Sequence, residues 1–122
     1  MSMEFVALIS SGKGSWGQVA GLVNRGSWDN AILIVNEFAK ARISSFDFAK
    51  KTEMIVIDFD SPIKDVIDNI KEKLKGKIKG IEVALSLASG EGREHMALIS
   101  ALLQLPVGIK FIALTREGIV EF

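Results

Sequence analysis

The sequence has no cysteine, a single histidine and only two prolines among its 122 residues. Without cysteine the chain makes no disulfide of its own and offers no thiolate to a metal, which is typical of proteins in a reducing compartment. No apolar run approaches the roughly 20 residues of a membrane-spanning helix. The first residues also lack the basic flank and long apolar core of a signal peptide. These absences predict a cytoplasmic protein that does not enter a membrane.

Net charge is absent as well, because 15 basic side chains balance 15 acidic ones. A chain without a basic field does not attract duplex DNA or RNA over a distance, so a nucleotide ligand has to be held locally. No metal site and no cofactor is predicted, since the acidic residues Glu53, Asp58, Asp60 and Asp65 show no ligand spacing. The lone histidine, His95, has no second histidine at metal-binding distance along the chain and is more typical of a half-buried or interface residue.

Almost half of the residues are hydrophobic and a quarter are charged, which predicts one globular domain over residues 1–122. Short apolar runs alternate with helical patterns. The predicted strands are residues 4–9, 31–35, 53–59, 81–88, 109–114 and 119–122. Two of the predicted helices are residues 15–24 and residues 94–105. A third helix lies between them: it is capped by Asp60, has Pro62 in its first turn and ends at Gly76. Residues 38–50 are left as a short helix or an irregular crossover.

This alternation predicts a Rossmann-like, three-layer α/β domain. We expect a mostly parallel sheet in the order of about 3-2-1-4-5, because crossovers between parallel strands are right-handed. The last two strands, joined by a turn at Gly118, are predicted to form a C-terminal antiparallel hairpin.

A glycine-rich loop follows the first predicted strand. Residues 12–17 (GKGSWG) match the pattern G-x-G-x-x-G between a strand and a helix, where the backbone can approach a phosphate at the helix N-terminus. The predicted ligand-binding residues of this loop are Ser10, Ser11, Gly12, Lys13, Gly14 and Ser15. Lys13 adds a cation and the serines add hydroxyl donors. The alternative is a glycine-rich turn that only lets the helix pack closely on the strand.

Glu37 follows the second predicted strand, where dinucleotide-binding domains place an acidic residue on a ribose hydroxyl. The alternative is an ordinary surface carboxylate. A P-loop is excluded because the pattern G-x-x-x-x-G-K-[ST] does not occur in the sequence.

The sequence Ser89-Gly90-Glu91-Gly92-Arg93 repeats this design after the fourth predicted strand. The guanidinium of Arg93 can bind a phosphate through two parallel hydrogen bonds. Glu91 would repel an anion, so it is expected to point outward, bind a ribose or cap the helix. The alternative is a well-capped turn without a ligand. In a sheet of order 3-2-1-4-5 the first and fourth strands are neighbours, so both loops would border one crevice at the topological switch point.

The last predicted helix is apolar almost all round. Its apolar residues are Met96, Ala97, Leu98, Ile99, Ala101, Leu102, Leu103 and Leu105. A peripheral helix covers the sheet with one side only, so the second apolar side predicts a twofold homodimer. The alternative is a helix buried beneath the terminal hairpin.

From residue 81 to the end, the sequence predicts a strand, then Ser-Gly-x-x-Arg at the start of an apolar helix, then the hairpin KFIAL-TREG-IVEF. With this order of elements the chain resembles CARF domains (CRISPR-associated Rossmann folds). That family usually has Thr/Ser-Gly-Gly-Thr-Lys/Arg after its fourth strand. Ser89, Gly90 and Arg93 match it, whereas Glu91 and Gly92 depart from it. The resemblance implies a dimer that binds a cyclic oligoadenylate with the loops after its first and fourth strands. It points to Ser10, Ser11 and Lys13, and to Ser89, Gly90 and Arg93.

The predicted function is therefore a dimeric sensing domain for a cyclic oligoadenylate or a similar phosphate ligand. Some CARF domains cleave the ring, which leaves slow, metal-independent ring cleavage open, with Ser11, Lys13 and Arg93 as the catalytic candidates. An NAD-type dinucleotide-binding protein is an alternative that G-x-G-x-x-G and Glu37 favour. A structural dimerisation module without a ligand is a further alternative.

Overall fold

Alternating strands and helices make up the chain, of which the computed structural model describes residues 3–10 and 16–122. The strands are β1 (Glu4–Ile9), β2 (Asn30–Val35), β3 (Glu53–Val56), β4 (Glu82–Ser86), β5 (Gly108–Thr115) and β6 (Gly118–Glu121). The helices are α1 (Trp16–Arg25), α2 (Glu37–Ile43), α3 (Asp47–Lys50), α4 (Ile63–Leu74) and α5 (Gly92–Leu103). The segment that the sequence leaves unassigned thus contains most of α2 and the whole of α3.

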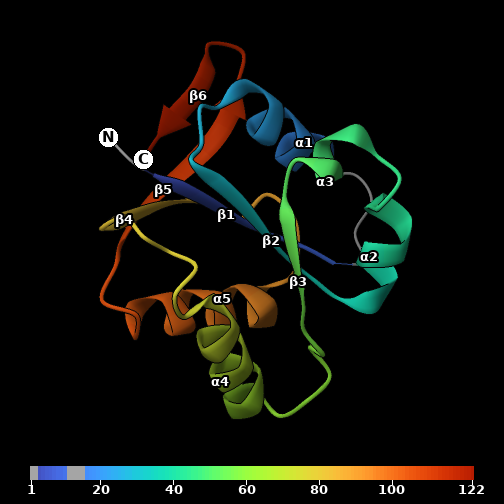
Figure 1. The fold of residues 1–122 in the computed structure, drawn as a ribbon, viewed down its shortest axis with the longest axis vertical. Helices are drawn as coiled ribbons and strands as arrows, with labels where there is room; N and C mark the ends of the chain where they lie inside the picture. Colours follow the sequence, from blue (N-terminus) through green and yellow to red (C-terminus); the bar gives the residue numbers. More distant parts are fainter. Residues whose placement is uncertain (1–2, 11–15) are drawn as a thin grey trace.

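One six-stranded sheet in the order β3-β2-β1-β4-β5-β6 runs through the molecule (Figure 1). Every neighbouring pair is parallel except β5 and β6, which are antiparallel. This arrangement confirms the predicted Rossmann-like fold, the strand order and the C-terminal hairpin. β1 and β4, consecutive in space but not in sequence, mark the point where the strand order reverses.

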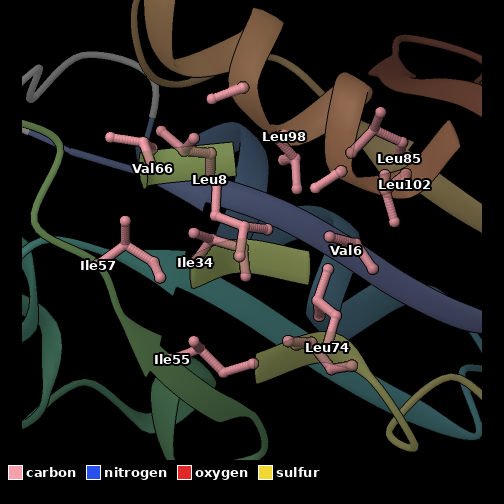
Figure 2. Close-up of a cluster of buried hydrophobic side chains, with 14 of the residues drawn as sticks. Val6, Leu8, Ile34, Ile55, Ile57, Val66, Leu74, Leu85, Leu98 and Leu102 are labelled. Carbon is pink, nitrogen blue, oxygen red and sulfur yellow. The ribbon is translucent and has the colours of Figure 1, made fainter. Parts of the chain in front are cut away.

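Both faces of the sheet are covered, so the central strands are apolar at almost every position. All six residues of β1 are buried, as a parallel sheet between two helical layers requires. Successive side chains point to opposite faces. Val6 and Leu8 contribute to the core that Leu98 and Leu102 of α5 complete (Figure 2). The alternate residues of β1, Phe5, Ala7 and Ile9, pack on the other face of the sheet against α1, α2 and α3.

Two helix starts differ from the sequence-based expectation. β3 ends at Val56, and residues 57–62 form a turn in which the carboxylate of Asp58 accepts the Asp60 amide at 3.0 Å and the Ser61 hydroxyl at 3.3 Å. Asp60 is therefore not the cap of α4, and Pro62 occupies the position before its first residue. α5 begins at Gly92, two residues before the predicted start.

None of the helices in the described part of the chain has the length and apolar character needed to cross a bilayer.

Candidate functional site

The carboxyl ends of four strands lie side by side at one edge of the sheet. Ile9 of β1 pairs with Val35 of β2, and Val35 pairs with Val56 of β3. On the other side of β1, Ala7 pairs with Ser86 of β4. The loops that follow these strands therefore start next to one another. In open α/β sheets this edge is where ligands bind.

A buried glutamate joins the end of β1 to the start of α5. The Ser10 hydroxyl donates a hydrogen bond to Glu94 Oε1 at 2.8 Å, and the Glu91 amide donates to the same oxygen at 2.9 Å. The Glu91 side chain in turn accepts from the backbone at Glu94, which completes a capping box. Ser10 is 1% exposed and Glu94 is 8% exposed. Ser10, the first residue of one predicted loop, therefore contacts Glu94, the residue directly after the other, at the topological switch point.

Most of the first predicted loop lies outside the residues that the structure describes. Ser11, Gly12, Lys13, Gly14 and Ser15 lie outside the described residues. Their predicted roles in holding phosphate, and those of Ser11 and Lys13 in catalysis, remain predictions. Ser10, the remaining predicted ligand-binding residue of this loop, lies within the described residues, and its hydroxyl bonds Glu94.

The Arg93 side chain points to the turn after β3. Its Nη1 donates to the Phe59 carbonyl and its Nη2 donates to the Ser61 carbonyl at 2.6 Å. The two-pronged hydrogen bonding that the sequence assigns to a phosphate is thus made with two main-chain oxygens. A guanidinium has five N–H donors, so donors remain beyond these two bonds.

The turn between β4 and α5 is tightly built around Gly90. Gly90 has φ of +103°, which favours glycine. His95 Nε2 lies 2.7 Å from the Ser89 carbonyl oxygen. Because a carbonyl only accepts, Nε2 carries the proton. The Ser89 hydroxyl is buried and has no hydrogen-bond partner among the described residues, a costly arrangement that is unusual in a folded protein.

A cavity of about 810 Å³ opens at the same edge, beyond the ends of β2 and β3. Its volume falls within the usual range for small-molecule sites. It is lined by Asn36, Glu37, Phe38, Val56, Ile57, Asp58, Phe59, Asp60, Asn69, Lys73, Glu91 and Glu94. Of the predicted site residues in the described part of the chain, Glu37 and Glu91 lie in this lining. The sequence does not predict that side chains of α4 and of the 57–62 turn line the site.

The cavity is acidic. Five carboxylates line it against one ammonium group, that of Lys73, which donates to the Val56 carbonyl at 2.9 Å. Phe38, 41% exposed, adds an aromatic ring, and the Arg42 guanidinium lies 4.5 Å from the centre of that ring. Despite the carboxylates, no group of side chains in residues 3–10 and 16–122 is arranged to hold a metal ion.

Apolar side chains also gather on the outer side of α5 and on the hairpin. Met96 is 54% exposed and Leu103 is 67% exposed, although the opposite side of α5 is buried in the core. A second hollow, of about 460 Å³, is lined by Leu85, Leu87, Ala88, Phe111, Ile112, Ala113 and Phe122. Phe111 pairs with Leu85, which packs in the core below α5, so this groove opens on the α5 face of the sheet.

Comparison with protein-family models gives no match for this chain, and comparison with curated protein sequences gives none either. The site combines a switch point between two loops, a helix N-terminus and an acidic cavity.

Proposed function

We propose that this chain is a nucleotide-sensing domain that binds a phosphorylated nucleotide ligand at the carboxyl edge of its sheet and acts as a homodimer. A cyclic oligoadenylate, the ligand that the CARF resemblance implies, is the first candidate. Its phosphates would lie against the loops after β1 and β4. Part of each nucleoside would enter the cavity beyond β2 and β3.

The observation that carries this proposal is the contact between Ser10 and Glu94. It brings the loop after β1 and the N-terminus of α5 together at the switch point, where open α/β sheets bind their ligands. The capping box occupies the amides of Glu91 and Glu94, and the positive end of the α5 dipole lies at this point. Ligand chemistry is thus expected where the two sequence motifs meet.

The charges of the cavity indicate which part of a nucleotide would enter it. Carboxylates accept hydrogen bonds from ribose hydroxyls and base amino groups but repel phosphate. Phosphate is therefore expected outside the cavity, on the side of the loop that contains Lys13, away from Glu91 and Glu94. Glu37 then fits the ribose-binding role that the sequence suggests for it, whereas Glu91 caps α5, one of the roles that the sequence left open for it.

Titration calorimetry with cyclic tetra-adenylate tests the proposal. We expect saturable binding that Lys13→Ala weakens about tenfold or more, because a charge-assisted hydrogen bond to phosphate is lost. Lys64→Ala, an exposed lysine on α4, is the control and should bind as the wild type does. An absence of heat with cyclic tetra-adenylate, AMP and NADH alike would leave a structural dimerisation module.

Ring cleavage is tested in the same samples by chromatography. Intact ligand after hours of incubation would indicate a sensor without turnover. A linear product whose formation Ser11→Ala slows would add the ring-nuclease activity. Lys13, a further catalytic candidate, would then stabilise charge on the reacting phosphate.

The homodimer would use the outer side of α5 and the neighbouring groove. Met96, Ile99 and Leu103 recur at helical spacing on that side, and Met96 and Leu103 stay largely exposed. A second copy of the chain is the simplest partner, since the same surface would serve both subunits. Light scattering after size exclusion should give a dimer for the wild type and a monomer for the double variant Met96→Lys/Leu103→Lys. A wild type that is monomeric at all concentrations would contradict the homodimer.

An NAD-type dinucleotide site is the second candidate, favoured by one observation. Glu37, the first residue of α2 directly beyond β2, lines the cavity where such sites hold a ribose. NADH fluorescence separates the two candidates. Enhancement with NADH and no heat with cyclic tetra-adenylate would favour the dinucleotide.

A further inference from the structure

We infer that Arg93 is a positioning residue, which holds the 57–62 turn in place as a wall of the cavity and does not serve as the phosphate ligand. The expected effect of Arg93 on nucleotide affinity rests on the proposed function. The positioning itself follows from contacts in the described residues.

Arg93 connects two walls of the cavity that are far apart in the sequence. It belongs to the first turn of α5, where the N-cap Glu91 and the helical residue Glu94 line one side of the cavity. Its two bonds reach the carbonyls of Phe59 and Ser61, in the turn whose residues line another side. The guanidinium therefore fixes the distance between the start of α5 and the turn after β3.

The geometry suits this task. A guanidinium is planar and presents its donors in a rigid fork, so one side chain can hold two carbonyls two residues apart along the chain. Charge-assisted hydrogen bonds of this kind are stronger than neutral ones. The ammonium of lysine is a point charge without such a fork and cannot replace it fully.

The position of two carboxylates depends on this turn. Asp58 folds the turn by accepting the Asp60 amide and the Ser61 hydroxyl, and both Asp58 and Asp60 line the cavity. Loss of the Arg93 bonds frees the segment that carries both acidic groups. Arg93 would thus set how the cavity meets a nucleoside without touching it.

The first part of the test needs no ligand. Backbone order parameters from ¹⁵N relaxation are measured at Asp60 and Ser61 in the wild type and in Arg93→Ala, Arg93→Lys and Arg116→Ala. We expect values of about 0.85 in the wild type and below about 0.6 in Arg93→Ala. Arg93→Lys should lie in between. Arg116→Ala, which removes the same charge from the exposed turn between β5 and β6, should match the wild type. Unchanged order parameters in Arg93→Ala would overturn the inference.

The second part separates positioning from contact with phosphate. Affinity for cyclic tetra-adenylate is measured against salt concentration in the wild type and Arg93→Ala. A positioning residue predicts weaker binding with an unchanged salt dependence, whereas a phosphate contact predicts a reduced salt slope, which would overturn the inference. If the wild type does not bind cyclic tetra-adenylate, its candidacy as the ligand fails, and the order parameters still decide the role of Arg93.

Discussion

Gly90→Ala is expected to lower the free energy of unfolding by roughly 2–5 kcal/mol, the combined cost of a strained backbone and an overpacked site. Gly90 has φ of +103°, and a Cβ there would lie 2.4 Å from Leu8 Cδ2. The same Cβ would lie 3.0 Å from His95 Nε2 and 3.1 Å from Glu94 Oε1. The methyl group thus pushes on the core, on the histidine that holds the turn and on the link between β1 and α5. Urea unfolding measures the loss of stability.

Gly118→Ala is the matched control for this substitution. Its φ of +105° is nearly the same, but a Cβ at this position meets open space. We expect only the backbone strain, about 1–2 kcal/mol. Ligand affinity should fall in Gly90→Ala alone, because Gly90 shapes the start of α5 and Gly118 lies in the terminal hairpin. Equal losses of stability in the two variants would contradict the close packing around Gly90.

The sequence predicts the bounds of β1 and, to within one residue, those of β2, whereas β4, also buried, is shorter than the predicted residues 81–88. β1 was predicted with its observed bounds because every one of its residues is buried and its polar loop begins at once. β3 was predicted to extend to residue 59, yet it ends at Val56. Ile57 and Phe59 are buried without belonging to a strand, so an apolar residue indicates burial and not its secondary structure. α3, four residues long, is too short for a helical period to show.

The site could be predicted in part, because its motifs are local but its cavity is not. Two loops at the carboxyl edge were indicated by glycines between strands and helices, and Ser10 and Glu94 do meet there. Asp58 lies in the turn after β3 and Lys73 near the end of α4, and the packing of α4 back along the sheet brings both to the cavity. The sequence motif indicates Arg93, but the spacing of a motif does not determine the direction of its side chain. Its partners are main-chain carbonyls in a turn that the sequence assigned to a strand and a cap.

Glu94→Ala is expected to lower the free energy of unfolding by about 2–4 kcal/mol, because it leaves two donors at a largely buried position without their acceptor. These donors are the Ser10 hydroxyl and the Glu91 amide, both within 2.9 Å of Glu94 Oε1. Glu94→Gln keeps an acceptor oxygen and loses only the negative charge beside the helix N-terminus, so about 1 kcal/mol is expected. Urea unfolding orders the three proteins as wild type, Glu94→Gln and Glu94→Ala.

Glu4 provides the control that separates stability from function. It is 3% exposed and accepts the amides of Lys79 at 3.0 Å and Gly80 at 3.2 Å, but it lies at the amino end of β1, opposite the site. Glu4→Ala should therefore destabilise the protein about as much as Glu94→Ala, since each removes a buried carboxylate with two donors. Only Glu94→Ala should weaken nucleotide binding at temperatures where both variants are folded. Equal affinities in the two variants would mean that the link between β1 and α5 holds the fold together but plays no part in shaping the site.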